Sequence, residues 1–139
     1  MLAFTYVSTQ VTGGLIGEFK FNNSYANGAG NVSFIANAGT SFITDRDDNV
    51  NSAININNTG LAGVIPNLPY GSSNRTISLW AKLNTYNATS FNYPFFYGQS
   101  ANTFGLSVNS TTTVLYSVPF LTTVNDATPV NTWCHFIIT

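Results

Sequence analysis

The chain is predicted to be an all-β protein, an antiparallel β-sandwich, because three features of its sequence agree. Residues 76–83 alternate apolar and polar side chains with a period of two, as a pleated strand requires. Roughly eight to ten short segments of this kind follow one another, separated by Asn, Gly and Pro, at the spacing typical of a sandwich. No stretch shows the apolar period of an amphipathic helix.

Segment 76–83 is the clearest strand, and both of its faces carry large side chains. The apolar face consists of Ile77, Leu79, Ala81 and Leu83. The opposite face consists of Ser78, Trp80 and Lys82. A tryptophan opposite an apolar face favours burial on both sides of the strand, so we expect Trp80, like Trp133, to lie in the core rather than on a ligand-binding surface.

The first half of the chain is predicted to contain four strands, preceded at residues 1–13 by a leading strand or a linker. The four strands are expected at Leu15–Phe21, Val32–Ile35, Ser41–Thr44 and Ala53–Asn57. Ile65–Pro69 is expected to be an extended edge or connection, because proline has no N–H to donate to a ladder.

The second half is predicted to continue with short strands after segment 76–83. These are expected at Tyr93–Gly98, Thr103–Val108, Thr113–Val118 and Trp133–Ile138. No sequence repeat of fixed period and no internal boundary is visible. Residues 14–139 are therefore predicted to form one domain, long enough to build a core.

The composition points away from nucleic acid and towards an extracellular or cell-surface protein. Only 6 % of the residues are charged and the net charge is −1, so no basic stripe is available for phosphates. The polar surface must come from Asn, Ser and Thr, as is common in secreted β proteins. No apolar run approaches the roughly 20 residues of a membrane span. The N-terminus lacks the basic region of a signal peptide, so we expect such a signal upstream.

Several motifs, taken in order, resemble those of laminin-G-like, concanavalin-A-like jelly-roll modules. The chain contains counterparts of the family's opening strand, its glycine-rich turn and its Thr-Asp-Arg segment with the strand after it. It also contains counterparts of the proline-containing connection, of the strands that follow and of the Trp-x-His strand. They are Gly14–Asn22, Gly28–Asn31, Thr44–Ala53, Ile54–Asn57, Ile65–Pro69, Thr76–Leu83, Phe104–Leu106 and Asn131–His135.

This resemblance implies a jelly-roll sandwich over residues 14–139 whose last strands are missing from this chain. Members of the family continue for several strands beyond the Trp-x-His strand, whereas this chain ends at Thr139. The uncovered edge would be adhesive. We therefore expect the module to associate with copies of itself or with other domains of a larger chain.

The acidic loop after residue 44 is the candidate metal site. Its oxygen-bearing side chains are Asp45, Asp47, Asp48 and Asn49, and Asn27 or Asn31 could add to them. Calcium prefers six to eight oxygen ligands, and the family often holds a structural Ca²⁺ near a loop rim. In the alternative interpretation, Asp45 caps a turn and Arg46 pairs with Asp47 or Asp48.

Aromatic residues after segment 76–83 form the candidate ligand-binding set, which consists of Tyr86, Phe91, Tyr93 and Tyr97. Tyrosines flanked by amides can stack on sugar rings and offer a hydroxyl group. In the alternative interpretation, alternate members of the set fill the core.

Catalysis is not expected. Glycoside hydrolysis needs two facing carboxylates, and outside the acidic loop the sequence offers Glu18 and Asp126 alone. Cys134 and His135 are adjacent in a predicted strand and so point to opposite faces, where they cannot act as a nucleophile and its base. We therefore expect a buried thiol and a packed histidine.

Two functions are consistent with the sequence. The first is a non-catalytic secreted or cell-surface adhesion module that binds a glycan or an extracellular protein, with a structural Ca²⁺ as its only expected cofactor. The alternative is a structural subunit or decoration domain of an extracellular filament, sheath or virion, assembled by strand complementation between neighbours. The chain length and the apolar segment 133–138 favour the alternative, and the family resemblance favours the first.

Overall fold

The computed structural model describes residues 13–30, 32–56, 60–71, 73–86, 92–98, 103–117, 120–124 and 127–139. These residues contain ten strands and no helix, so the chain is all-β as predicted. They belong to two compact units, residues 1–68 and residues 69–139. The prediction of one domain over 14–139 stays a prediction, and each unit is described by itself.

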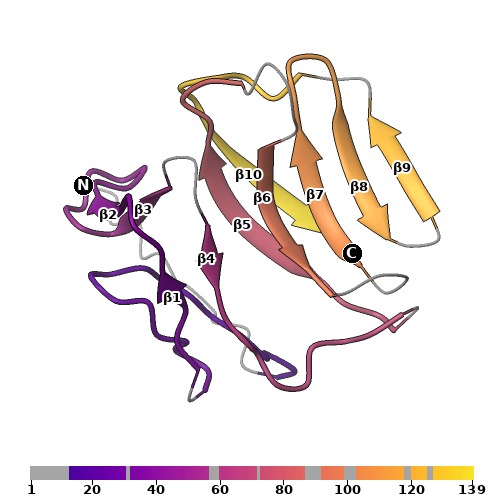
Figure 1. Cartoon of the computed structure of the whole chain (residues 1–139), viewed down its shortest axis with the longest axis horizontal. Coiled ribbons are helices and arrows are strands. Elements are labelled where there is room, and N and C mark those ends of the chain that lie inside the picture. Colours follow the sequence, from indigo (N-terminus) through magenta and orange to yellow (C-terminus); the bar gives the residue numbers. More distant parts are fainter. Residues whose placement is uncertain are drawn as a thin grey trace, which may run out of the picture. The chain divides into compact units, whose positions relative to one another are not determined.

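The first unit is built from two short antiparallel pairs (Figure 1). Strand β2 (Thr40–Ile43) pairs with β3 (Ala53–Ile56), so that Phe42 lies opposite Ile54. Strand β1 (Ile35–Ala36) pairs with β4 (Leu61–Ala62). The predictions of strands at 41–44 and 53–57 are confirmed to within a residue at their ends.

The predicted strand at Leu15–Phe21 is wrong, because these residues form no ladder. The backbone N–H of Glu18 donates to the side chain of Asn27 at 2.8 Å, and the N–H of Gly28 donates to the carbonyl of Glu18 at 2.7 Å. Phe21 then adopts a positive φ of 55°, which ends the extended conformation. The alternation of residues 15–21 predicts an extended backbone, but a local pattern does not determine whether another strand pairs with it.

The second unit contains a four-stranded antiparallel sheet in the order β6-β7-β8-β9. Its strands are β6 (Asn92–Tyr97), β7 (Phe104–Val108), β8 (Thr113–Ser117) and β9 (Phe120–Val124). The register places Leu106, Leu115 and Thr122 in one row across three strands, and therefore on one face. Strand β9 was not predicted.

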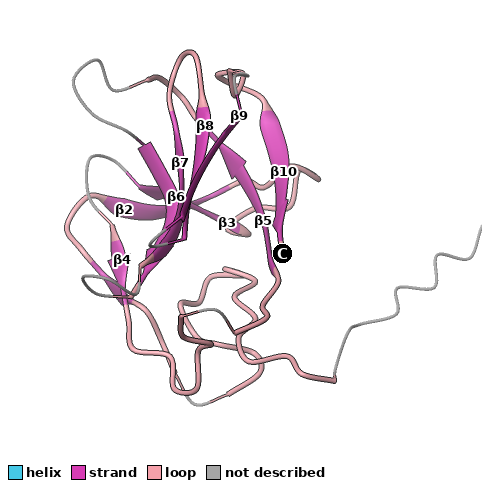
Figure 2. Cartoon of the chain, turned by 90° about the vertical axis from the view of Figure 1, so that its right-hand side faces the viewer, coloured by secondary structure: helices cyan, strands magenta, loops and turns pink. Residues whose placement is uncertain are grey.

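A second sheet of the same unit pairs β5 (Ile77–Lys82) with β10 (Trp133–Ile138). Figure 2 shows these two strands as a layer distinct from β6 to β9. Between the layers lies a core of buried residues, namely Leu83, Phe104, Leu106, Val108 and Ile138, against which Leu79, Phe95 and Phe136 pack. The second unit therefore has the two-layer construction of a sandwich. Strands β5 and β10 lie where the sequence predicted them.

Candidate functional site

The candidate site is the outer face of the β5–β10 sheet, the side turned away from the core. Alternation along each strand and the antiparallel register place six side chains on this face, as three opposed pairs. The pairs are Ser78 with Ile137, Trp80 with His135, and Lys82 with Trp133. We call these six residues the outer aromatic face.

Specific contacts order the outer aromatic face. The rings of Trp80 and His135 are stacked, with their centroids 4.6 Å apart and their planes within 6° of parallel. Ser78 Oγ lies 2.8 Å from His135 Nε2, a hydrogen bond that ties the imidazole ring of β10 to the neighbouring strand β5 on the same face. The ammonium group of Lys82 lies over the Trp133 ring, 5.2 Å from its centroid. Cross-strand stacking and cation–π contacts of this kind hold side chains in one conformation.

The opposite side of the same two strands anchors this face. Leu79 lies opposite Phe136 and Ile77 opposite Ile138, and all four pack in or against the core. Because the inner residues are fixed by packing, the backbone that carries the outer residues is fixed as well. The outer aromatic face is therefore a preorganised surface.

The outer aromatic face is accessible and carries positive charge. Trp80 is 44 % exposed and Ile137 63 % exposed. Two of the other three basic residues pair with carboxylates, Lys20 with Glu18 and Arg46 with Asp47. Arg75 donates to backbone carbonyls and to Tyr97. Among the described residues, Lys82 has no carboxylate partner, so its charge remains available to a ligand.

The prediction that Trp80 is a core residue is wrong, because almost half of its side chain is exposed. Trp133 is partly buried and lies on the same outer face. His135, which we expected to be packed, is exposed and stacked on Trp80. The alternation of the sequence could have indicated this exposure, because Trp80 and His135 stand at the positions of their strands that face away from the apolar side chains.

Of the four aromatic residues expected to bind a ligand, the three that the structure describes do not form one surface. Tyr97 packs against the core, and its hydroxyl group donates to the carbonyl of Pro69 at 3.2 Å and accepts from Arg75 at 2.9 Å. Tyr86 also packs against the core and donates to the carbonyl of Thr128. Tyr93 is 51 % exposed and meets Phe96 edge to face. Phe91 lies outside the described residues.

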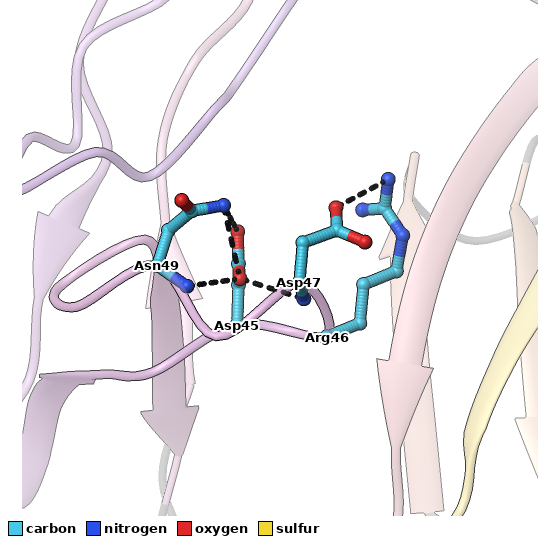
Figure 3. Close-up of polar contacts among 4 residues, drawn as sticks. All are labelled: Asp45, Arg46, Asp47 and Asn49. Carbon is cyan, nitrogen blue, oxygen red and sulfur yellow. Dashed lines mark hydrogen bonds and ion pairs between the residues drawn. The ribbon is translucent and has the colours of Figure 1, made fainter. Parts of the chain in front are cut away.

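The acidic loop is closed by its own hydrogen bonds (Figure 3). Asp45 accepts from the backbone N–H groups of Asp47 at 2.8 Å and Asn49 at 2.9 Å, and from the Asn49 amide at 3.1 Å. Arg46 and Asp47 form an ion pair at 3.0 Å. These are the contacts of the alternative interpretation, a capped turn with an internal ion pair.

The same contacts determine the ionisation of Asp45. Desolvation raises the pKa of this carboxyl group, but the hydrogen bonds from Asn49 and Asp47 together with the charge of Arg46 outweigh that effect. The pKa of Asp45 is therefore held below its ordinary value. A carboxylate whose oxygens already accept several N–H groups is stabilised as an anion without a metal.

The calcium site at this loop stays a prediction, and the structure shows what its candidate ligands already contact. The carboxylates of Asp45 and Asp47 are directed at N–H donors and a guanidinium group, so Asp48 and Asn49 would have to supply most of the ligands. The amide oxygen of Asn27, another candidate donor, accepts from the backbone of Glu18 and Ala29. Asn31 lies outside the described residues, and in the described part of the chain no three acidic, histidine or cysteine side chains are grouped to hold a metal.

A cavity of about 380 Å³ opens beside β10 in the second unit. Residues 135–139 form one wall, and the opposite wall includes Leu106, Leu115 and Thr122 from β7, β8 and β9. Neither the position nor the size of this cavity could be predicted from the sequence, because it depends on how far the two sheets overlap.

No family model, curated protein or solved structure matches the chain. The resemblance to laminin-G-like modules is therefore supported by the sequence motifs alone. In the part of the chain that the structure describes, no helix is long and apolar enough to cross a membrane.

Proposed function

We propose that the chain is a non-catalytic adhesion module of laminin-G-like jelly-roll type that binds a glycan outside the cell, and that the glycan binds to the outer aromatic face. One observation carries the proposal: two indole rings, an imidazole, a hydroxyl group and an ammonium group share one ordered, accessible surface.

The chemistry of this surface suits a sugar. The apolar C–H face of a pyranose ring packs against aromatic side chains, and its hydroxyl groups need donors and acceptors beside the ring. Trp80 and Trp133 supply the aromatic surface, while Ser78, Lys82 and His135 supply the polar groups. Most of these side chains are already held by contacts with one another, so binding would cost little side-chain entropy.

The proposal of a non-catalytic role rests on the carboxylates. Glu18 lies 3.5 Å from Lys20, Asp45 caps a turn and Asp47 pairs with Arg46. Asp126 lies outside the described residues. The outer aromatic face contains no carboxylate, and two facing carboxyl groups are what hydrolysis of a glycoside usually needs.

A glycan array with the fluorescently labelled full chain tests the proposal, followed by titration of each glycan that binds. Trp80→Ala and Lys82→Gln should each weaken binding about tenfold, equivalent to about 1.4 kcal/mol. Tyr93→Ala is the matched control, because Tyr93 is a similarly exposed aromatic residue on β6, in the other sheet.

The outcomes separate the alternatives. Loss of binding in Tyr93→Ala with retention in Trp80→Ala would move the site to the aromatic residues near 86–97. Absence of binding to every glycan on the array, with a folded protein, would refute the glycan proposal. Binding to an immobilised extracellular protein that Trp80→Ala abolishes would keep the face and change the class of ligand.

A further inference from the structure

Two exposed side chains of opposite charge form no ion pair within the described part of the chain. Asp48 is exposed in the loop between β2 and β3, and no described basic side chain pairs with it. Lys82 lies on the outer aromatic face and contacts the Trp133 ring. The other described charges are engaged locally, by ion pairs, by the turn cap at Asp45 or by the carbonyl groups around Arg75. Among the described residues, one anion and one cation are therefore available to a partner.

The loop that carries Asp48 is ordered and presents an apolar residue beside the charge. Asp45 closes the turn by accepting from the N–H groups of Asp47 and Asn49 (Figure 3). Asp48 lies between these residues with a positive φ of 63°. Val50 follows two residues later and is 75 % exposed. The loop thus offers a carboxylate and an apolar side chain on a backbone that its own hydrogen bonds hold in place.

The outer aromatic face offers the complementary groups at a matching separation. Lys82 and the 44 % exposed Trp80 stand two residues apart on one strand, which places them about 7 Å apart along it. Asp48 and Val50 are also two residues apart, so their Cα atoms are at most about 7 Å from each other. The carboxylate can therefore reach the ammonium group while the valine contacts the indole ring.

The distribution of charge along the chain favours association head to tail. Residues 1–68 contain two basic and four acidic side chains, a net charge of −2, and residues 69–139 contain two basic and one acidic, a net charge of +1. A symmetric pairing of two outer aromatic faces would bring two Lys82 ammonium groups into one interface. A loop against a face joins opposite charges instead, and opposite charges steer association.

We propose that the loop of residues 45–50 of one copy binds to the outer aromatic face of the next, with the Asp48 carboxylate on Lys82 and Val50 against Trp80. Because the two surfaces differ, the contact repeats from copy to copy and builds an open chain or a ring. The contact is small and its ion pair is exposed, so we expect a dissociation constant of about 0.1–1 mM. The association needs no glycan, and a glycan bound to the same face would compete with the loop.

Charge reversal in the full chain tests the proposal, with association measured by sedimentation equilibrium in the absence of glycan. Asp48→Lys and Lys82→Glu should each raise the dissociation constant about tenfold or more, because each brings like charges together. The double variant with both changes has opposite charges again and should associate as the wild type does, which also shows that the variants are folded. An equimolar mixture of the two single variants should associate as well, since each supplies the surface that the other lacks.

Two further variants separate this contact from a general effect of charge. Ser41→Lys is the matched control and should associate as the wild type does, because Ser41 is exposed on β2, outside the loop. Val50→Ser leaves the charge unchanged and should raise the dissociation constant about tenfold. A wild-type chain that is monomeric at millimolar concentration, or a double variant that does not recover, would overturn the proposal. A mixture of the single variants that stays monomeric would overturn it too, because the contact would then lie within one chain. Glycan binding is measured separately, so either proposal can fail alone.

Discussion

Gly105 is the position where one added methyl group should have the clearest effect on the second unit. A Cβ atom built there would lie 2.5 Å from Cδ2 of Phe96, 3.2 Å from the carbonyl oxygen of Phe95 and 3.3 Å from Cα of Phe96. The Phe96 ring, opposite Gly105 in the β6–β7 pair, covers the backbone where a side chain would otherwise stand. Gly105→Ala therefore has to displace this ring and strain two backbone contacts.

The magnitude follows from these contacts. The ring has to move from 2.5 Å to at least the 3.4 Å of an ordinary contact, and Phe96 is already 53 % exposed. Losing about half of the burial energy of a phenylalanine costs about 1 kcal/mol. Overpacking against the backbone adds about 1 kcal/mol to this loss of stability. Alanine has a lower conformational entropy than glycine in the unfolded chain, which reduces the loss by about 0.5 kcal/mol. We expect a net loss of about 1–2 kcal/mol in the free energy of unfolding.

Urea denaturation monitored by tryptophan fluorescence measures the unfolding of the second unit, because the two tryptophans lie in its strands β5 and β10. The control is the double variant Gly105→Ala with Phe96→Ala, in which the ring is absent and most of the cost should disappear. A Gly105→Ala protein as stable as the wild type, or a cost that is the same without the ring, would refute the argument.

Three further predictions concern single contacts. Ser107→Ala should leave the free energy of unfolding unchanged or raise it by up to about 1 kcal/mol. The reason is that Ser107 Oγ is buried and has no hydrogen-bond partner among the described residues. A clear fall in the free energy of unfolding, measured by urea denaturation, would show that the hydroxyl group has a partner. Because the folded-state pKa of Asp45 is lowered, its stabilisation should be complete above the unfolded value near 3.8 and fall as the pH drops through the folded value. The stability difference between the wild type and Asp45→Asn should therefore shrink in acid, and a difference that is constant with pH would contradict this. A double-mutant cycle of Trp80→Ala and His135→Ala should give a coupling free energy of about 0.5–1.5 kcal/mol, and a coupling of zero would mean that the stacked rings do not stabilise the strand pair.

Adding Ca²⁺ or EGTA to the full chain should leave the melting temperature unchanged, because the carboxylates of Asp45 and Asp47 are engaged by N–H donors and by Arg46. A rise in melting temperature with Ca²⁺ that Asp48→Asn abolishes would contradict this expectation and support the calcium site.

Local sequence patterns were sufficient to predict a strand where the segment alternates regularly and has well-defined ends. Segment 76–83 predicted β5, and segment 133–138 predicted β10 with its ends correct. The same patterns failed at residues 15–21, which also alternate in part but pair with no strand among the described residues. They also missed β9, where residues 120–124 lack alternation of apolar side chains.

The candidate site shows the same division between local and tertiary information. The spacing of Asp45, Arg46, Asp47 and Asn49 determined the capped turn, because all of its contacts are made within five residues. The sequence could not decide that Tyr86 and Tyr97 face the core while Tyr93 is exposed. Which aromatic side chains are covered depends on residues distant in the chain.

The sequence by itself determined that the protein is all-β and which side chains of each strand share a face, because a period of two is a property of the extended backbone. Only the tertiary structure decided which face is covered, which strands are paired and which edges are open. Trp80 and His135 are 55 positions apart, and their stacking follows from the register of β5 and β10. The cavity beside β10 is lined by residues of β7, β8 and β9 from one sheet and of β10 from the other, so no single segment of the sequence encodes it.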